Sequence, residues 1–199
     1  MNRILNITGI ALLLFFAAGQ ADAQGRAAVR GTRANSDGGV THVSGSAAQT
    51  PAGGKVARGR AVRSDGQGNV VGGSAAAGQT AAGGTAGRAS AFQRNADGSF
   101  QRDGSAAVNS AAGGSASSSG SISGDGQGNV RGSRSTSGQT AAGGRFDSQT
   151  TGATGEGIQH GTTATSATGN TYDGQTTVTQ DGVSHSHVCY NALGEQIDC

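Results

Sequence analysis

The feature that most constrains the fold is a repeat of 30 residues. Pro-Ala-Gly-Gly at residues 51–54 is followed in the same register by Ala-Ala-Gly-Gly at residues 81–84, 111–114 and 141–144. Midway between these sites, Asp-Gly-Gln-Gly-Asn-Val stands at residues 65–70 and again at 125–130. A fixed period of this size is typical of repeat architectures. The units are 25–54, 55–84, 85–114, 115–144 and a degraded 145–174, so we expect a repeat region at 24–174 and an end piece at 175–199.

Inside each unit the residues alternate and show no stripe at helical spacing. Phe100, Arg102, Gly104, Ala106 and Val108, for example, would share one face of a strand. Frequent glycine disfavours helix by about 1 kcal/mol for each glycine. Strands separated by Asp-Gly and Gly-Gly turns fit the pattern better. We therefore predict an all-β chain of antiparallel hairpins, with two strands of about 10–12 residues in each unit.

The spacing of large apolar residues predicts how the strands pair. Val62 and Val70 lie symmetrically about Gly66. The pairs Phe92 with Phe100, and Ile122 with Val130, are symmetric about the corresponding positions of the next two units. If each midpoint is a hairpin turn, the members of each pair face each other directly across two strands.

The repeat pattern is compatible with two ordered architectures and with a disordered chain. An extended meander of hairpins and a β-solenoid share the same local pattern, and Asp-Gly turns favour the meander. The 38 glycines among 199 residues and the shortage of large apolar residues pull towards disorder. A net charge of +2 and a single proline count against it, because disordered chains tend to be highly charged or proline-rich. We expect an ordered meander.

The two ends of the chain predict its location. Residues 1–23 have the form of a signal peptide, with Arg3, an apolar run at 10–18 and the cleavage pattern Ala-Asp-Ala at 21–23. The run is shorter than the ~20 apolar residues that span a membrane, so we expect cleavage and export to the periplasm, cell surface or medium. Cys189 and Cys199 are close in sequence, and in an oxidising compartment they predict a disulfide that closes a small acidic hairpin.

Few residues offer catalytic or metal chemistry. His185, His187 and Cys189 alternate and would share a strand face, which is a pattern that binds Zn²⁺ or Cu²⁺. The disulfide would remove the thiolate, however, so a solvated histidine pair is the simpler interpretation. The Asp-Gly turns lack the ligand pattern of a calcium loop, and the glycine runs lack the lysine of a phosphate loop. We therefore expect no enzymatic activity, no cofactor and no metal.

Charge is segregated along the chain. From Gln24 to Arg145 there are thirteen basic residues and five acidic ones, a balance of +8. From Phe146 onwards there are six acidic residues and no Lys or Arg, a balance of −6. Such an uneven distribution of charge along the chain is typical of proteins that bind charged partners. A basic stretch would contact polyanions such as extracellular DNA or acidic polysaccharide, although charges on strands also protect against aggregation. It comprises Arg58, Arg60 and Arg63, preceded by Arg26, Arg30 and Arg33.

The leader, the Gly/Ser/Thr/Ala-rich hairpin units and the ending Cys-Tyr-Asn-Ala-Leu-Gly-Glu-Gln-Ile-Asp-Cys resemble uncharacterised secreted repeat proteins of proteobacteria. The resemblance covers the chain after the leader and implies no activity. Our hypothesis is an exported structural or surface-interaction protein that self-associates in the cell envelope or extracellular matrix. The alternative is an extracellular or periplasmic binding module for polyanions or metal. Ice binding through threonine-rich segments such as 162–165 is less well supported, because the threonine spacing is irregular.

Overall fold

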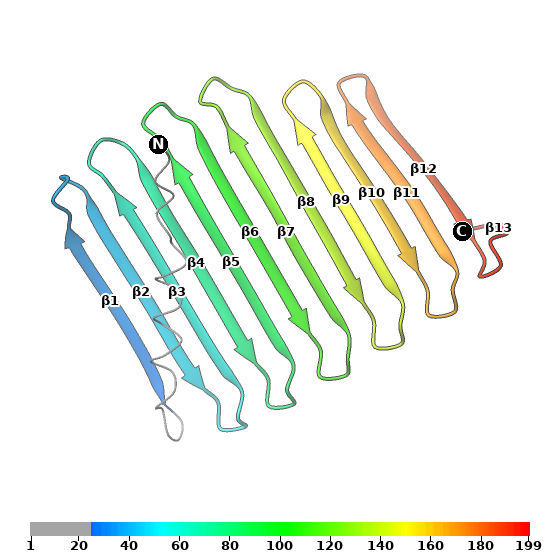
Figure 1. The fold of residues 1–199 in the computed structure, drawn as a ribbon, viewed down its shortest axis with the longest axis horizontal. Helices are drawn as coiled ribbons and strands as arrows, with labels where there is room; N and C mark the ends of the chain where they lie inside the picture. Colours follow the sequence, from blue (N-terminus) through cyan, green and yellow to red (C-terminus); the bar gives the residue numbers. More distant parts are fainter. Residues whose placement is uncertain (1–24) are drawn as a thin grey trace.

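The structure, a computed structural model, describes residues 25–199, and the expected leader lies outside them. The described chain forms one antiparallel sheet of thirteen strands, each paired with the next along the chain (Figure 1). The predicted all-β meander is therefore confirmed. The strands are β1 (Arg26–Ala34), β2 (Val40–Gln49), β3 (Lys55–Ser64), β4 (Val70–Gln79), β5 (Thr85–Arg94), β6 (Phe100–Asn109), β7 (Ser115–Gly124), β8 (Val130–Gln139), β9 (Arg145–Ala153), β10 (Gly157–Thr165), β11 (Thr171–Thr179), β12 (Gly182–Tyr190) and β13 (Gln196–Ile197).

Units and strands coincide over most of the repeat. Residues 55, 85, 115 and 145, which begin the second to fifth units, are the first residues of β3, β5, β7 and β9. The expected division between residues 174 and 175 falls inside β11, so the acidic end continues the same sheet.

Two kinds of turn join most of the strands, one along each margin of the sheet (Figure 1). In the turn at 65–69, the Asp65 carboxylate accepts hydrogen bonds from the backbone N–H groups of Gln67 (2.8 Å) and Asn69 (3.1 Å). In the turn at 80–84, the N–H of Thr80 donates to the carbonyl of Gly84 (2.8 Å). Gly83 has φ +90° there, a conformation that glycine adopts without steric cost. The repeated turn sequences thus determine where most of the strands end. The turns at 154–156 and 180–181 have other sequences and lengths.

The pairing register assigns every residue to one of two faces. Directly paired residues lie on the same side of a sheet, and neighbours along a strand lie on opposite sides. From β1 to β11 the even-numbered strand residues share one face, exemplified by the row Arg30, Ser44, Arg60, Ser74 and Ser90. We call this side the arginine face. The odd-numbered residues form the other side, called the small-residue face because alanine, glycine and serine predominate there.

The turn between β11 and β12 reverses this numbering. It contains only Gln180 and Asp181, so that Thr179 pairs with Gly182. On β12 the odd-numbered residues therefore join the arginine face. His185 and His187 accordingly lie on the same side as Arg60.

The predicted direct pairing of apolar residues is wrong. Val62 pairs with Gly72, and Val70 pairs with Ser64, because the five-residue turn is centred on Gln67 instead of Gly66. The two valines still share a face but are diagonal neighbours. In the next unit, Phe92 pairs with Arg102 and Phe100 pairs with Arg94.

Glycine takes the place that an opposing side chain would fill. Gly72 pairs across β4 and β5 with Phe92, whose ring lies over the glycine backbone. A Cβ atom added to Gly72 would be 2.6 Å from Cε1 of that ring. Gly124 receives Phe100 and Gly138 receives Phe146 in the same way. The aromatic residues thus pack against glycine backbone on the neighbouring strand.

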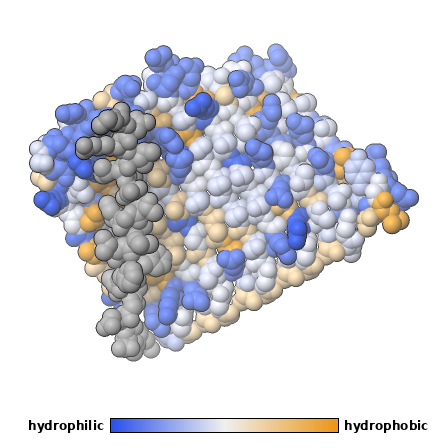
Figure 2. All heavy atoms as spheres, viewed as in Figure 1, coloured by the Kyte–Doolittle hydropathy of each residue, from blue (hydrophilic) through white to orange (hydrophobic). Residues whose placement is uncertain are grey.

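The described part of the chain, residues 25–199, contains no buried hydrophobic side chain. Ile158 and Val183 expose 50% and 72% of their surface. Figure 2 shows one side of the sheet, where small, weakly polar residues cover much of the surface and apolar residues are scattered among them. The molecule is therefore a single layer, whereas domains generally bury a core between two layers.

Candidate polyanion-binding face

Basic side chains concentrate on the arginine face. It carries eight arginines and all four histidines of the chain, and no strand residue on it is acidic. The three carboxylates that lie within strands, Asp103, Asp147 and Asp173, are on the small-residue face. The arginines are Arg26, Arg30, Arg58, Arg60, Arg88, Arg94, Arg102 and Arg134, and all of them are exposed.

Two neighbouring rows of side chains form a central polar band on this face. One row runs from Arg30 through Arg60 to Arg134, and it continues to His160 and His185. The other contains Arg58, Arg88 and His187. Largely apolar rows flank the band. One contains Val62, Phe92, Ile122 and Ile158 together with Arg102, and the other contains Val56, Val108, Phe146 and Tyr172 together with Arg26. The band is thus a cationic strip between two largely apolar rows.

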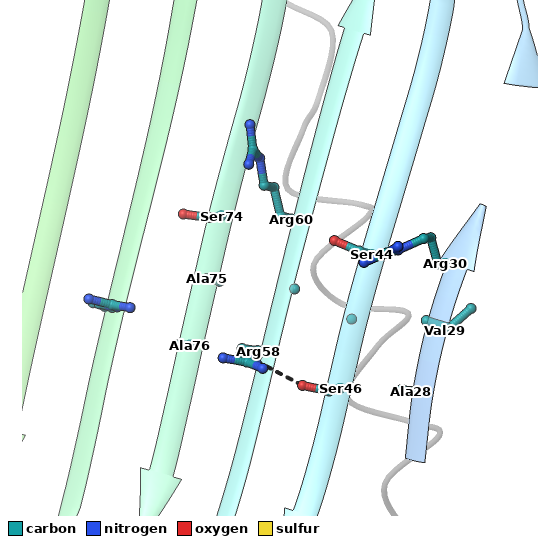
Figure 3. A pocket seen from close by; sticks show the side chains of 13 residues that line it. Ala28, Val29, Arg30, Ser44, Ser46, Arg58, Arg60, Ser74, Ala75 and Ala76 are labelled. Atoms are coloured by element: carbon teal, nitrogen blue, oxygen red, sulfur yellow. Dashed lines mark hydrogen bonds between the residues drawn. The ribbon is translucent and has the colours of Figure 1, made fainter. Parts of the chain in front are cut away.

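A shallow groove lies in the part of this band that crosses β1 to β5 (Figure 3). Its volume is about 510 Å³. Backbone atoms of the intervening row, such as Gly45 and Gly59, form its floor. Its walls are the side chains of Ala28, Arg30, Ser44, Ser46, Arg58, Arg60, Ser74, Ala76 and Arg88. The groove therefore presents four guanidinium groups and three hydroxyl groups. They lie in two rows that run perpendicular to the strands.

Serine hydroxyls orient two of the arginines. Arg58 donates from Nε to Oγ of Ser46 across β2 and β3 (2.9 Å), which Figure 3 shows as a dashed line. Arg134 donates from Nε to Oγ of Ser118 (3.0 Å). In each case the terminal nitrogens of the guanidinium remain available for an anion. In the described chain none of the arginines on this face forms an ion pair with a carboxylate.

The structure divides the basic stretch that the sequence suggested. Arg58 and Arg60 lie on the arginine face, but Arg63 is odd-numbered and lies on the opposite face. There it forms an ion pair with Asp37 (2.6 Å), and its hydrogen bond is the main reason that the pKa of Asp37 is lowered. Arg63 therefore does not belong to a site with the other two.

Arg30, which the sequence placed in the basic stretch, and Arg88, which it did not, complete the groove. They come from β1 and β5, on either side of the strand that carries Arg58 and Arg60. Their even numbers were the available signal, because directly paired positions in neighbouring strands from β1 to β5 are an even number of residues apart. That signal becomes useful only once the turn length is known.

The histidine pair is placed as the alternation predicted, on one face with Cys189. The rings of His185 and His187 are 5.3 Å apart between centroids, and Nδ1 of His185 is 2.9 Å from Oγ1 of Thr176. Cys189 forms the predicted disulfide with Cys199, so its sulfur cannot act as a thiolate ligand. Within residues 25–199 no group of three potential ligands among His, Cys, Asp and Glu is arranged to hold a metal ion.

The Asp-Gly turns use their carboxylates internally. Asn69 donates its side-chain amide to Asp65, and Asn129 does the same to Asp125. These bonds, followed by the backbone N–H groups of Gln67 and Gln127, lower the pKa values of both aspartates. The aspartates of the repeated sequence therefore stabilise their own turns.

Comparisons with protein-family models, curated proteins and solved structures gave no match to this chain. The resemblance to secreted hairpin-repeat proteins thus stays a prediction from the sequence. Among residues 25–199, no helix is long and apolar enough to cross a membrane.

Proposed function

We propose that this protein is an exported, non-enzymatic structural protein that self-associates through the edges of its sheet in the cell envelope or extracellular matrix. The observation that carries the proposal is a single-layer sheet whose two end strands have unpaired outer edges. Such edges are templates for pairing with another chain. The disulfide is compatible with an oxidising location outside the cytoplasm.

The two edges have the directions needed for continuous pairing. Nothing in the described chain pairs with the outer side of β1. At the other end, β13 pairs only with Cys189 and Tyr190, so the outer side of Gly182 to Val188 is unpaired in the structure. Because β1 and β13 run in the same direction, β1 of a second copy would be antiparallel to β12. The contact joins two different surfaces, so it can propagate into a filament.

Charge favours the same contact. β1 carries Arg26, Arg30 and Arg33. The unpaired stretch of β12 is flanked by Asp181 on one side and by Glu195 and Asp198 on the other. Opposite charges at the two ends of the sheet attract one molecule to the next and disfavour the reverse arrangement.

Light scattering on the mature, oxidised protein tests the proposal. We expect the mean mass to grow with protein concentration at low salt and to fall as ionic strength rises, because salt screens exposed charges. A variant with Asp181→Lys, Glu195→Lys and Asp198→Lys should remain monomeric. The matched control, with Asp103→Lys, Asp147→Lys and Asp173→Lys, changes the net charge equally but on a sheet face, and it should still associate.

Two results would contradict edge association. One is a strict monomer at low salt and high concentration, which would mean that the disulfide-closed tail is sufficient to cap the sheet. The other is an equal loss of association in both triple variants, which would indicate an effect of net charge without a defined contact.

A further inference from the structure

We infer that the groove across β1 to β5 binds a linear acidic polysaccharide, with the polymer lying perpendicular to the strands. This inference does not depend on edge association, because the groove is open on a sheet face of a single molecule. It rests on the arrangement of Arg30, Arg58, Arg60 and Arg88 on one face and on the absence of strand carboxylates there in the described chain.

The arginines are staggered over two neighbouring rows, with Arg30 in the row of Arg60 and Arg88 in the row of Arg58. Arg58 and Arg60 are two residues apart on β3, a separation of about 7 Å. Arg88 lies in the row of Arg58 but two strands away, a separation of about 10 Å. The guanidinium fork pairs with carboxylates through two parallel hydrogen bonds. A polymer with carboxylates at regular intervals can therefore meet several arginines at once.

The spaces between arginines suit the neutral parts of a sugar chain. Ser44, Ser46 and Ser74 line the groove and offer hydroxyl groups that both donate and accept hydrogen bonds. Ala28 and Ala76, together with the glycine floor, keep the surface low enough for sugar rings to approach. The groove crosses four inter-strand gaps and is thus about 19 Å long.

The same surface is poorly suited to nucleic acid. A flat sheet face offers no helix or ribbon that projects into the grooves of a duplex. Binding of single strands generally uses aromatic side chains on which bases stack. Here Phe92 lies over Gly72, in the row bordering the central band, and none of the described residues that line the groove is aromatic.

Isothermal titration of the mature, oxidised protein with polygalacturonate tests the inference. A variant with Arg58→Ser, Arg60→Ser and Arg88→Ser should bind about tenfold more weakly, because three of the four guanidinium groups that pair with carboxylates are removed. The matched control carries Lys55→Ser, Arg131→Ser and Arg145→Ser on the small-residue face. Its net charge is the same, and its affinity should fall less than threefold. Both variants should retain the β-sheet circular dichroism spectrum.

Oligomer length and competing polymers sharpen the test. The affinity of galacturonate oligomers should rise with length and level off once an oligomer spans the groove, and neutral dextran should not bind. Equal losses in the two triple variants would overturn the inference in favour of diffuse electrostatic attraction. Tighter, groove-dependent binding of duplex DNA than of polygalacturonate would overturn the assignment to polysaccharide.

Discussion

At the scale of single residues, glycine sets the packing on the arginine face. A strand glycine usually weakens a sheet because it has no side chain to pack. Here Gly72 receives the ring of Phe92 from the next strand, and the backbone carbonyl of Ala61 would be only 2.9 Å from an added Cβ. Gly161, by contrast, has open space around its Cα. The repeat therefore contains glycines with a packing role and glycines without one.

Replacing these two glycines should separate the roles. Gly72→Ala should destabilise the sheet by about 1–3 kcal/mol, the usual effect of overpacking, because the new methyl group meets both a ring and a carbonyl. Gly161→Ala should change the free energy of unfolding by less than about 0.5 kcal/mol. Urea denaturation measures both. Adding Phe92→Ala to the first variant should recover part of the loss, and equal effects of the two single substitutions would refute a packing role for Gly72.

The aspartates of the turns predict a dependence on pH. Side-chain hydrogen bonds from Asn69 and Asn129 lower the pKa values of Asp65 and Asp125 below the ordinary value. A carboxyl group whose pKa is lower in the folded state than in the unfolded state stabilises the fold at pH values above its unfolded-state pKa. This contribution to stability is lost as the pH falls through the folded-state pKa. The urea concentration at the midpoint of unfolding should therefore decrease as the pH is lowered below about 4.

Substitution of the carboxylates provides the control for this prediction. Asp65→Asn and Asp125→Asn together keep an acceptor oxygen in each turn but remove the titration, so the midpoint should vary less between pH 5 and pH 2. An unchanged acid response in the double variant would count against the turns as its source.

At the scale of elements, the last strand depends on the disulfide. β13 has two residues and pairs with only two residues of β12. Closing a loop of this length contributes about 3 kcal/mol in the chain-entropy model. Because each strand in a repeat sheet contacts only its neighbours, the loss of β13 should stay local.

Hydrogen exchange tests that locality. In a Cys189→Ser, Cys199→Ser variant, amides of β13 and of the end of β12 should exchange much faster, while those of β3 to β8 should be unchanged. Without reductant, the exported wild-type protein should be lighter by two hydrogens in mass spectrometry than after reduction. Two free thiols in the exported protein, or loss of protection throughout the sheet, would contradict this account.

At the scale of the whole molecule, the 30-residue period preserves the two faces. A strand and its turn usually occupy 15 residues here, an odd number, so a shift by 15 moves every side chain to the opposite face. A shift by 30 restores it. The sequence therefore repeats every two strands, even though the backbone conformation repeats with every strand.

Two deletions distinguish these periods. Removing residues 85–114 takes out β5, β6 and their turns, and it places Ile122 opposite Gly72 on the same face. Removing residues 85–99 leaves an equally regular backbone but turns Arg102 and all following residues of the repeat to the other face. We expect the first deletion to keep cooperative urea unfolding and the second to lower the midpoint markedly. Equal midpoints would show that face identity contributes little to stability.

The sequence by itself determined the strands, the turns and the terminal disulfide. Each depends on residues close together in the chain: alternation within ten residues, glycine and aspartate in turns, and two cysteines ten positions apart. Local conformational preferences are enough for such features, so the all-β hairpin repeat followed from the residues alone. The choice of a meander over a solenoid also followed, from the turn sequences.

The tertiary structure decided the register and therefore the candidate site. The turn is centred on Gln67, one position after Gly66. This shift of one position places Val62 opposite Gly72 instead of opposite Val70. The same register gathers Arg30, Arg60 and Arg88 from three strands and separates Arg63 from them. Local sequence does not determine register here, because it depends on turn geometry and on how side chains pack across several strands at once.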